Sequence, residues 1–256
     1  MKVLGIDMGS REVKIALMED GQVLGMKKTG TMSFYKNYCS YKDGRLFVQV
    51  DKLGMGIPHR AVSTGYGRNN TDLHTFRPIT EIKAHVYGAL LQTGLENFVL
   101  LDIGGQDVKV VRVEKGLVTD LELNDKCAAS CGRYLENMAA VLEITVEQLS
   151  QHYLSPVDLN STCSVFSESE LIGRIAEGTA LERLCAGVNY SLYRRLNPML
   201  ERFKGGKLVL AGGVAGNKAL LRYLGNDFDE MVQMAEPQFN GALGCCSFAM
   251  KQKNFM

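Results

Sequence analysis

A nine-residue pattern occurs twice in this chain, and this repeat limits the possible folds more than any other feature. Residues 7–15 read DMGSREVKI and residues 102–110 read DIGGQDVKV, so the second copy lies 95 positions after the first. Each copy follows a short apolar run and continues into a second strand-like segment. A repeated strand, Asp-x-Gly turn and second strand predict a duplicated unit with two related lobes.

Each copy also continues into a third predicted strand, over residues 22–28 and 117–123. The dipeptides Asp-Gly at 20–21 and Lys-Gly at 115–116 are the expected turns before these strands. Hydrophobic periodicity and cap-like starts predict helices over 80–92, 132–142, 168–176, 179–203, 215–224 and 239–250, and strands near 207–211 and 228–232. The segment 31–57 has no clear period, and we expect it to hold one short helix.

Three glycine-bearing loops stand at the ends of predicted strands, at residues 5–10, 102–107 and 211–217. Glycines let successive backbone N–H groups approach an anion without obstruction by a Cβ, which makes a nest for phosphate oxygens. The third loop opens a helix, whose N-terminus also favours a ligand. No Walker-type string occurs, so Lys14 and Lys109 are interpreted as strand residues. The candidate nucleotide-binding residues are Gly9, Ser10, Gly104, Gly105, Gly212, Gly213 and Asn217.

The first two loops also carry candidate catalytic residues. Asp7 and Asp102 are suited to hold Mg²⁺, usually through its waters. Gln106 is suited to orient an attacking water without acting as a strong base. Asp107 is adjacent, but it would point to the opposite face if the strand began at Gln106. Because a sugar or acyl kinase would need a carboxylate as base, this set favours slow, switch-like ATP hydrolysis.

In their order along the chain, the loops resemble the phosphate-1, phosphate-2 and adenosine motifs of the actin, hexokinase and Hsp70-like ATPase superfamily. This resemblance implies a two-lobed, actin-like (ribonuclease H-like) α/β fold, with duplicated mixed β-sheet units and a nucleotide cleft between the lobes. We expect an N-terminal ATPase lobe over 1–95, with helix 239–250 as a candidate for packing back onto it. We expect a C-terminal ATPase lobe over 96–256, which carries the adenosine loop.

Cys127 and Cys163 lie in the segments NDKCAASC and STCSVFSESE, each just before a predicted helix. The positive end of a helix dipole stabilises a thiolate, which is the metal-binding form of cysteine. A four-iron cluster usually needs four thiolates, and a two-fold dimer would supply them from two copies of the chain. Two alternatives stay open: a zinc site across a dimer, and two small buried residues without metal.

Seven segments spread over nearly the whole chain resemble the ATP-dependent reductive activators of 2-hydroxyacyl-CoA dehydratases, in the BadF/BadG/BcrA/BcrD ATPase family. They are GIDMGS, STGYGRN at 63–69, LDIGGQDVKV, NDKCAA, STCSVFSESE, AGGVAGN and QFNGALG at 238–244. The resemblance implies that Cys127 and Cys163 bind one [4Fe-4S] cluster per homodimer, and that ATP/ADP binds with Mg²⁺. It also implies ATP-driven delivery of a low-potential electron to a client iron–sulfur enzyme.

The same resemblance implies the partners. The client is a 2-hydroxyacyl-CoA dehydratase, a benzoyl-CoA reductase or a double-cubane cluster protein, and ferredoxin or flavodoxin is the expected electron donor. We expect sensitivity to dioxygen and an anaerobic setting. Two rivals from other classes are a small-molecule kinase of the same superfamily, for a sugar or a carboxylate, and a non-redox binding or assembly ATPase.

Other polar and sulfur-bearing residues give weaker signals. Cys131, four positions after Cys127, is interpreted as a small packing residue rather than an extra thiol near the cluster. We assign helix packing to Cys185, Cys245 and Cys246, and no ligand role to Cys39. No partner at useful spacing is found in the sequence for His59, His74, His85 and His152.

Two pairs of residues outside the loops receive modest roles. Glu168 and Glu170 are interpreted as caps of the helix that follows Cys163. Tyr66 and Arg68 lie at a strand end, where they either signal nucleotide occupancy or shape a turn.

Composition argues against several classes of partner. The chain has 29 basic and 28 acidic residues, a net charge of +1, so no overall field attracts nucleic acid or an anionic membrane. The N-terminus does not resemble a signal peptide, and no apolar run approaches the roughly 20 residues that span a bilayer. Seven cysteines without a secretory context favour a reducing compartment, so we expect a cytoplasmic protein.

Overall fold

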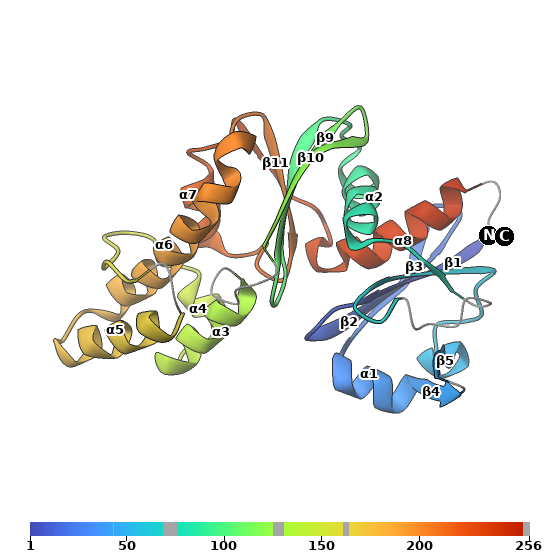
Figure 1. The fold of residues 1–256 in the computed structure, drawn as a ribbon, viewed down its shortest axis with the longest axis horizontal. Helices are drawn as coiled ribbons and strands as arrows, with labels where there is room; N and C mark the ends of the chain where they lie inside the picture. Colours follow the sequence, from blue (N-terminus) through green and yellow to red (C-terminus); the bar gives the residue numbers. More distant parts are fainter. Residues whose placement is uncertain (43, 69–75, 125–130, 161–163, 253–256) are drawn as a thin grey trace. The chain divides into compact units, whose positions relative to one another are not determined.

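The computed structural model describes residues 1–42, 44–68, 76–124, 131–160 and 164–252. Contacts divide the chain into two compact units, Met1–Leu95 with Met234–Met256, and Glu96–Gln233 (Figure 1). The last helix therefore belongs to the first unit, and the second unit ends at Gln233 rather than at residue 256. The described residues include no helix that is both long enough and apolar enough to cross a membrane.

The first unit is built on a five-stranded sheet with the order β3-β2-β1-β6-β7. Its strands are β1 (Lys2–Met8), β2 (Glu12–Glu19), β3 (Gln22–Gly30), β6 (Arg60–Gly65) and β7 (Arg77–Pro78). β1 pairs antiparallel with β2 and parallel with β6. The predicted turn before β3 is confirmed, because Asp20 and Gly21 have φ values of 48° and 89°, as a two-residue hairpin turn of type I′ requires.

Both faces of the first sheet are covered, as Figure 1 shows. Helices α2 (Glu81–Thr93) and α8 (Asn240–Lys251) pack on one face. Helix α1 (Thr31–Tyr38), the hairpin β4 (Cys39–Lys42) and β5 (Arg45–Val48), and the 3-10 helix η1 (Val50–Leu53) lie on the other. Alternation along β1 produces these two cores: Val3 packs with α8, whereas Leu4 and Ile6 pack with Phe34 of α1.

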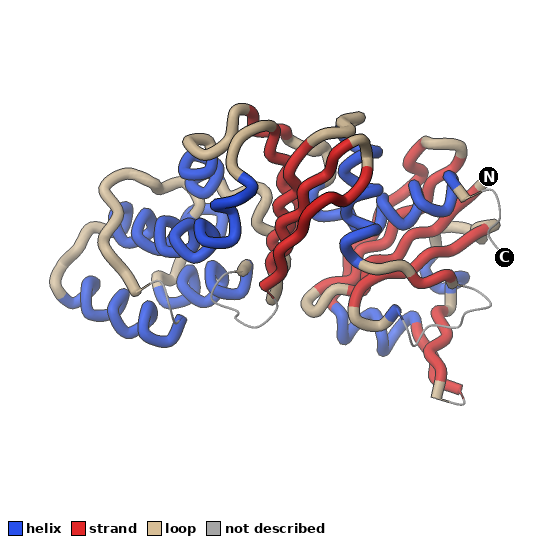
Figure 2. Tube along the Cα trace, turned by 45° about the horizontal axis from the view of Figure 1, so that its top comes forward, coloured by secondary structure: helices blue, strands red, loops and turns tan. Residues whose placement is uncertain are grey.

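The second unit repeats the strand order of the first, as β10-β9-β8-β11-β12. Figure 2 shows the two sheets in red. The strands are β8 (Phe98–Ile103), β9 (Val108–Glu114), β10 (Leu117–Asn124), β11 (Lys207–Gly212) and β12 (Glu230–Val232). The central strand β8 again has one antiparallel and one parallel neighbour. The predicted α/β fold with duplicated mixed sheets is confirmed.

Helices of the second unit pack on one face of its sheet around Val99, Leu101 and Ile103. They are α3 (Gly132–Val141), α4 (Val146–Leu149), α5 (Ser164–Ala176), α6 (Leu181–Leu200), the 3-10 turn η4 (Glu201–Phe203) and α7 (Lys218–Leu224). α5 begins four residues before the predicted start at 168. α7 begins later than predicted because the side chain of Asn217 caps it, accepting a hydrogen bond from the backbone N of Leu220.

Candidate functional site

The first glycine loop joins β1 to β2 and is fixed from outside by α1. Asp7 lies in β1, opposite Lys14 in β2 and Thr64 in β6. A Cβ at Gly9 would lie 2.8 Å from the carbonyl oxygen of Glu12, so only glycine fits this turn. The hydroxyl of Thr31 donates to the carbonyl of Gly9 at 2.8 Å. Ser10, also in this loop, is partly buried.

The second loop has the same backbone frame but a buried charge cluster. Asp102 is 2% exposed and lies opposite Lys109 in the strand pairing. The ammonium of Lys109 lies 3.3 Å from Oδ2 of Asp102 and also contacts the carboxylate of Asp107. β9 begins at Val108, so the strand start assumed at Gln106 was wrong, and Asp107 faces Lys109 from the loop. Gln106 is partly buried in the same loop.

The third loop lies beside the second one in the same unit. β11 pairs parallel with β8, which sets Gly212 opposite Ile103. Gly212 has a φ of 84°, and a Cβ there would lie 2.7 Å from Oδ1 of Asp102. Gly213 follows with open space at its Cβ position. This edge of the sheet therefore brings together the glycines of both loops and the carboxylate of Asp102.

Asn217 has a structural use at this loop. Its Oδ1 accepts from the backbone N of Leu220, and its Nδ2 donates to Oδ1 of Asn189, both at 2.8 Å. The side chain of Asn189 in turn donates to the carbonyls of Leu149 and Cys185 at 2.8 and 3.0 Å. Asn217 is only 5% exposed, so its amide fixes the direction in which α7 leaves the loop.

The second loop is bonded directly to the start of α3. The backbone N–H groups of Gly132 and Arg133 donate to the carbonyls of Gly104 and Gly105, at 2.9 and 3.1 Å. The thiol of Cys131 donates to the carbonyl of Gly105 at 2.9 Å. The loop therefore satisfies donors that a helix N-terminus otherwise leaves without a partner. A displacement of residues 104–105 would act directly on the first turn of α3.

Cys127 and Cys163 lie outside the described residues, but the helices that follow them are described. α5 begins at Ser164, immediately after Cys163. Cys131 is the N-cap residue of α3 with an extended φ of −139°, so the helical spacing assumed between it and Cys127 does not apply. Cys131 is fully buried, as the packing interpretation predicts. Among the described residues, no cluster of three or more His, Cys, Asp or Glu side chains is arranged to hold a metal ion.

The predicted packing role of three other cysteines is confirmed, because Cys185, Cys245 and Cys246 are 0% exposed. Burial raises the pKa of Cys185 to about 11 and that of Cys246 to about 12. Burial also raises the pKa of the partly exposed Cys39 to about 11. These thiols stay protonated at neutral pH, which makes them poor metal ligands.

The flanks of the Cys163 segment are held by Arg195 of α6. Its guanidinium donates to the carbonyl of Asn160 at 2.9 Å and to the hydroxyl of Ser167 at 2.7 Å. It also lies 4.0 Å from the ring centre of Tyr134 in α3. The helices that follow the two cysteine segments, α3 and α5, are thereby joined through α6.

The capping role predicted for Glu168 and Glu170 was wrong. α5 begins at Ser164, so both residues lie beyond its first turn, which contains no acidic residue. The carboxylate of Glu170 instead accepts from the backbone N of Asn160 at 2.5 Å. It therefore holds the chain segment that leads to Cys163.

His85 is a residue that the sequence reasoning missed. Its Nε2 lies 4.0 Å from Oδ2 of Asp7, a contact that the search for partners at useful sequence spacing did not find. The two residues are far apart in the sequence, and only the packing of α2 on the sheet brings them together. The sequence does contain a signal for it. His85 is the one ionisable residue among the buried residues of α2, which are Ala84, His85, Val86, Gly88 and Ala89.

The strand-end residues Tyr66 and Arg68 form a turn. The backbone N of Tyr66 donates to the carbonyl of Met8 at 3.0 Å, and its side chain is 63% exposed. The guanidinium of Arg68 donates to the carbonyl of Gly65 at 3.0 Å and lies 3.8 Å from Glu81. These contacts favour the turn-shaping interpretation over a nucleotide signal.

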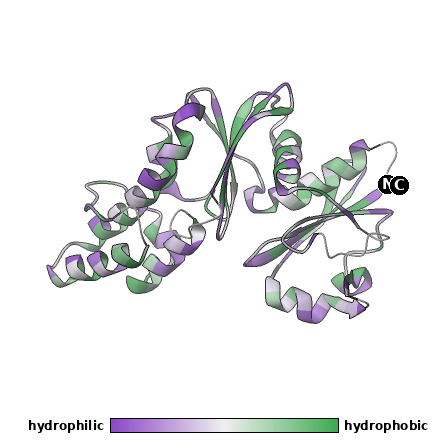
Figure 3. Ribbon diagram, viewed as in Figure 1, coloured by the Kyte–Doolittle hydropathy of each residue, from purple (hydrophilic) through white to green (hydrophobic). Residues whose placement is uncertain are grey.

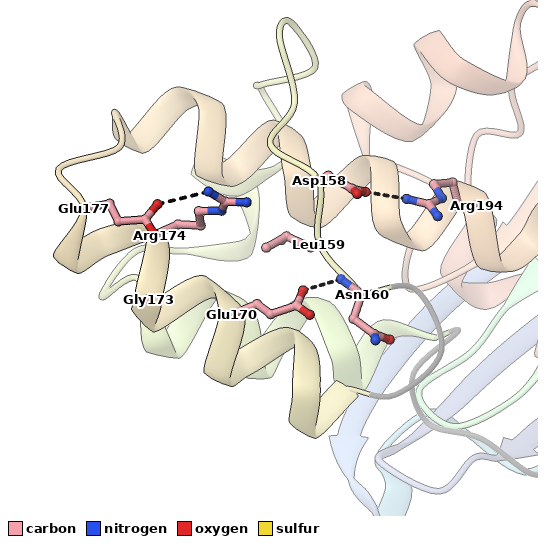
Figure 4. Close-up of a pocket in the computed structure, with 8 residues that line it drawn as sticks. All are labelled: Asp158, Leu159, Asn160, Glu170, Gly173, Arg174, Glu177 and Arg194. Atoms are coloured by element: carbon pink, nitrogen blue, oxygen red, sulfur yellow. Dashed lines mark hydrogen bonds and ion pairs between the residues drawn. The ribbon is translucent and has the colours of Figure 1, made fainter.

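A polar cavity of about 590 Å³ lies in the second unit, between α5, α6 and the segment before Cys163 (Figure 4). Arg194 pairs with Asp158 at 2.6 Å, and Arg174 pairs with Glu177 at 3.0 Å. The cavity is lined by Asp158, Leu159, Asn160, Glu170, Gly173, Arg174, Glu177 and Arg194. None of the candidate nucleotide residues is in this set, and its arginines are already paired with carboxylates.

Comparison with known proteins agrees with this geometry. The (R)-2-hydroxyglutaryl-CoA dehydratase activating ATPase of Acidaminococcus fermentans is 34% identical over 259 residues, covering 97% of each chain. The 2-hydroxyisocaproyl-CoA dehydratase activator of Clostridioides difficile is 31% identical, covering 98% of this chain and 96% of the relative. The solved structure of the Clostridium difficile activator of 2-hydroxyisocaproyl-CoA dehydratase, with bound ADPNP, superimposes with a TM-score of 0.83 at 28% identity. It covers 100% of both chains.

The family model described as the BadF/BadG/BcrA/BcrD ATPase family matches residues 4–249, which is nearly the whole chain. The match includes both Asp-x-Gly loops, the adenosine-type loop and the two cysteine segments. This chain belongs to the BadF/BadG/BcrA/BcrD ATPase family.

Proposed function

We propose that this chain is an ATP-dependent reductive activator, which couples ATP hydrolysis to the delivery of a low-potential electron to a client iron–sulfur enzyme. Membership of an ATPase family and similarity to dehydratase activators along the whole chain support this proposal. One structural observation carries the coupling: the loop at Gly104 and Gly105 bonds directly to the first turn of α3. The nucleotide loop is thus bonded to the helix that follows the Cys127 segment in the sequence.

In this proposal the two units are ATPase lobes, and the glycine loops hold the nucleotide. Asp7 and Asp102 would hold Mg²⁺ through its waters, and Gln106 would orient the attacking water. The phosphates would lie against Gly9, Ser10, Gly104 and Gly105. The adenosine would lie against Gly212 and Gly213, next to the turn that Asn217 fixes. The partly buried glycines at 9, 104 and 212 leave no room for a Cβ. Backbone of this kind is suited to close approach by a ligand.

Cys127 and Cys163 from two copies of the chain are proposed to hold one [4Fe-4S] cluster. When bound, the cluster would supply a one-electron carrier whose potential depends on hydrogen bonds and solvent exposure. The start of α5 directly after Cys163 suits a thiolate, because free N–H donors and the helix dipole stabilise its charge. Val165 and Phe166 on this first turn are 66% and 61% exposed. Such apolar exposure beside a proposed ligand supports cover by a second copy.

The proposed partners follow from the same reading. A second copy completes the cluster, and the client is a dehydratase or reductase that itself carries iron and sulfur. Ferredoxin or flavodoxin supplies the electron in the cytoplasm of an anaerobic cell. We expect the cluster to be lost on exposure to dioxygen.

The test is the iron content of protein purified without oxygen. We expect about four irons per dimer in the wild type, and none in the Cys127→Ala variant, with an unchanged circular dichroism spectrum. Cys39→Ala is the matched control, because Cys39 is a partly exposed cysteine of the other unit, and it should keep all the iron. Full iron in Cys127→Ala would remove Cys127 from the ligand set, and bound zinc in place of iron would overturn the redox proposal.

A further inference from the structure

Helices α2 and α8 approach each other, and the sheet, more closely than side chains normally allow. A Cβ at Gly88 of α2 would overlap the backbone carbonyl of Asn240, and one at Gly244 of α8 would overlap the carbonyl of Ala84. A Cβ at Gly241 would lie 2.5 Å from Oδ2 of Asp7 and 3.2 Å from Nε2 of His85. Figure 3 shows hydrophobic colouring along most of α8. These glycines therefore create a close contact around two polar side chains.

A chain of hydrogen bonds between polar groups crosses the interface of α2 and α8. Nε2 of Gln92 donates to Oδ1 of Asn240 at 3.0 Å. Nδ2 of Asn240 donates to the backbone carbonyl of His85 at 2.8 Å and lies 3.4 Å from its Nδ1. Gln92 is itself fixed by Glu236, whose backbone N donates to Oε1 of Gln92 at 2.9 Å. Because Asn240 is 0% and His85 8% exposed, their polar atoms are held in one arrangement.

The chain of polar contacts ends at the carboxylate of the first glycine loop. Nε2 of His85, on the side of the ring away from Asn240, lies 4.0 Å from Oδ2 of Asp7. The backbone of α8 at Gly241 closes the same side of the carboxylate. The separation suits a bridging water or a small approach of the carboxylate when a ligand binds. Helix packing alone does not require an imidazole at this position.

We propose that His85 is a positioning residue, which orients the carboxylate of Asp7 for the nucleotide reaction through its Nε2. Asn240, itself bonded to Gln92, holds the ring on its Nδ1 side, and the glycines at 88, 241 and 244 allow the close packing of the helices. Residues that orient a metal-associated carboxylate typically change activity about 10- to 100-fold when removed. This inference rests on the proposed nucleotide role of Asp7.

The test uses variants that replace one ring nitrogen at a time. His85→Gln places an amide nitrogen near the position of Nε2, whereas His85→Asn places one near Nδ1, on the side of Asn240. In full-length, oxygen-free protein, we expect His85→Ala and His85→Asn to lower kcat for ATP about 10- to 100-fold. KM should change less than about threefold, and His85→Gln should retain most of kcat. His59→Gln is the control, because the ring of His59 accepts from the backbone N of Lys2, at the start of β1 rather than at its Asp7 end. This variant should leave kcat unchanged.

Two further measurements separate this inference from the proposed function. In the Asp7→Asn background, His85→Ala should cause little further loss of kcat, because the group that it orients is gone. Equal losses of kcat in His85→Gln and His85→Asn would overturn the positioning role while leaving the ATPase proposal intact. Losses of kcat that follow the midpoint of thermal unfolding would do the same.

Absence of ATP hydrolysis in the wild type would overturn the proposed function by itself. In that case the midpoints of thermal unfolding still test the contact between the two residues. Non-additive shifts for Asp7→Asn and His85→Ala would support it, and additive shifts would contradict it.

Discussion

The two Asp-x-Gly loops share one backbone frame but place different side chains beside their carboxylates. Asp7 faces Lys14 and Asp102 faces Lys109 in equivalent strand pairings. Lys109 turns to its own loop and contacts Asp102 and Asp107, whereas Lys14 lies 3.5 Å from Oε2 of Glu12. His85, from the helix layer, lies 4.0 Å from Asp7. Duplication has kept the strands and the turn, while Lys109 reaches Asp102 from the sheet and His85 lies near Asp7 from the helix layer.

The largest difference between the loops should appear when the two lysines are removed. Lys109 is 9% exposed and joins two carboxylates, so Lys109→Met leaves like charges together in a buried site. We expect a loss of about 3–5 kcal/mol in unfolding free energy. Lys14→Met removes one pair with a more exposed glutamate, and we expect a loss of at most about 1 kcal/mol. Urea unfolding measures both, and similar losses would show that the loops are electrostatically equivalent.

A smaller effect is expected from glycines that border the two carboxylates. Gly241→Ala places a Cβ 2.5 Å from Oδ2 of Asp7, and Gly212→Ala places one 2.7 Å from Oδ1 of Asp102. We expect each to cost about 1–3 kcal/mol, with the larger loss at Gly212 because its φ of 84° also disfavours alanine. Gly213→Ala, with open space at its Cβ, is the control and should change unfolding by less than about 0.5 kcal/mol.

The smallest effect concerns buried thiols of the two units. The folded-state pKa is about 12 for Cys246 in the first unit and about 11 for Cys185 in the second, against an ordinary value of 9.0. Because these pKa values are raised, the stability that the thiols contribute is complete below pH 9. It is lost as the pH rises from 9 towards 11 or 12, since the unfolded chain deprotonates first.

Cys185→Ala and Cys246→Ala should therefore each flatten the fall of the thermal midpoint between pH 9 and 11. The double variant should flatten it further, although tyrosines with raised pKa values, such as Tyr193 and Tyr223, keep part of the slope. A pH profile identical to that of the wild type would show that these thiols ionise equally in both states.

Local signals predicted most of the framework. The turns at 20–21 and 115–116, the strands around both loops and the start of α2 at the Thr80 cap are encoded within a few residues. The hairpin of β4 and β5 was missed because half of its strand side chains are exposed and only Leu46 is buried, so it lacks an apolar alternation.

The site was predicted less completely than the fold. Its glycines and aspartates follow from loop motifs, but the contact of His85 with Asp7 depends on how α2 and α8 pack, which no local pattern shows. The same holds for Lys109, whose strand position was expected while its contacts with Asp102 and Asp107 were not. Cys127 and Cys163 stay predictions, because they lie outside the described residues.

The return of α8 to the first sheet has a consequence for synthesis. Nearly all of α8 is buried, and Cys245, Cys246 and Phe248 complete the core under β1 and β2. A growing chain therefore makes the whole second unit before the first can close, and an apolar sheet face stays bare during translation. Contacts this distant in the chain slow folding, so the first unit is the part of the newborn protein most in need of chaperone protection.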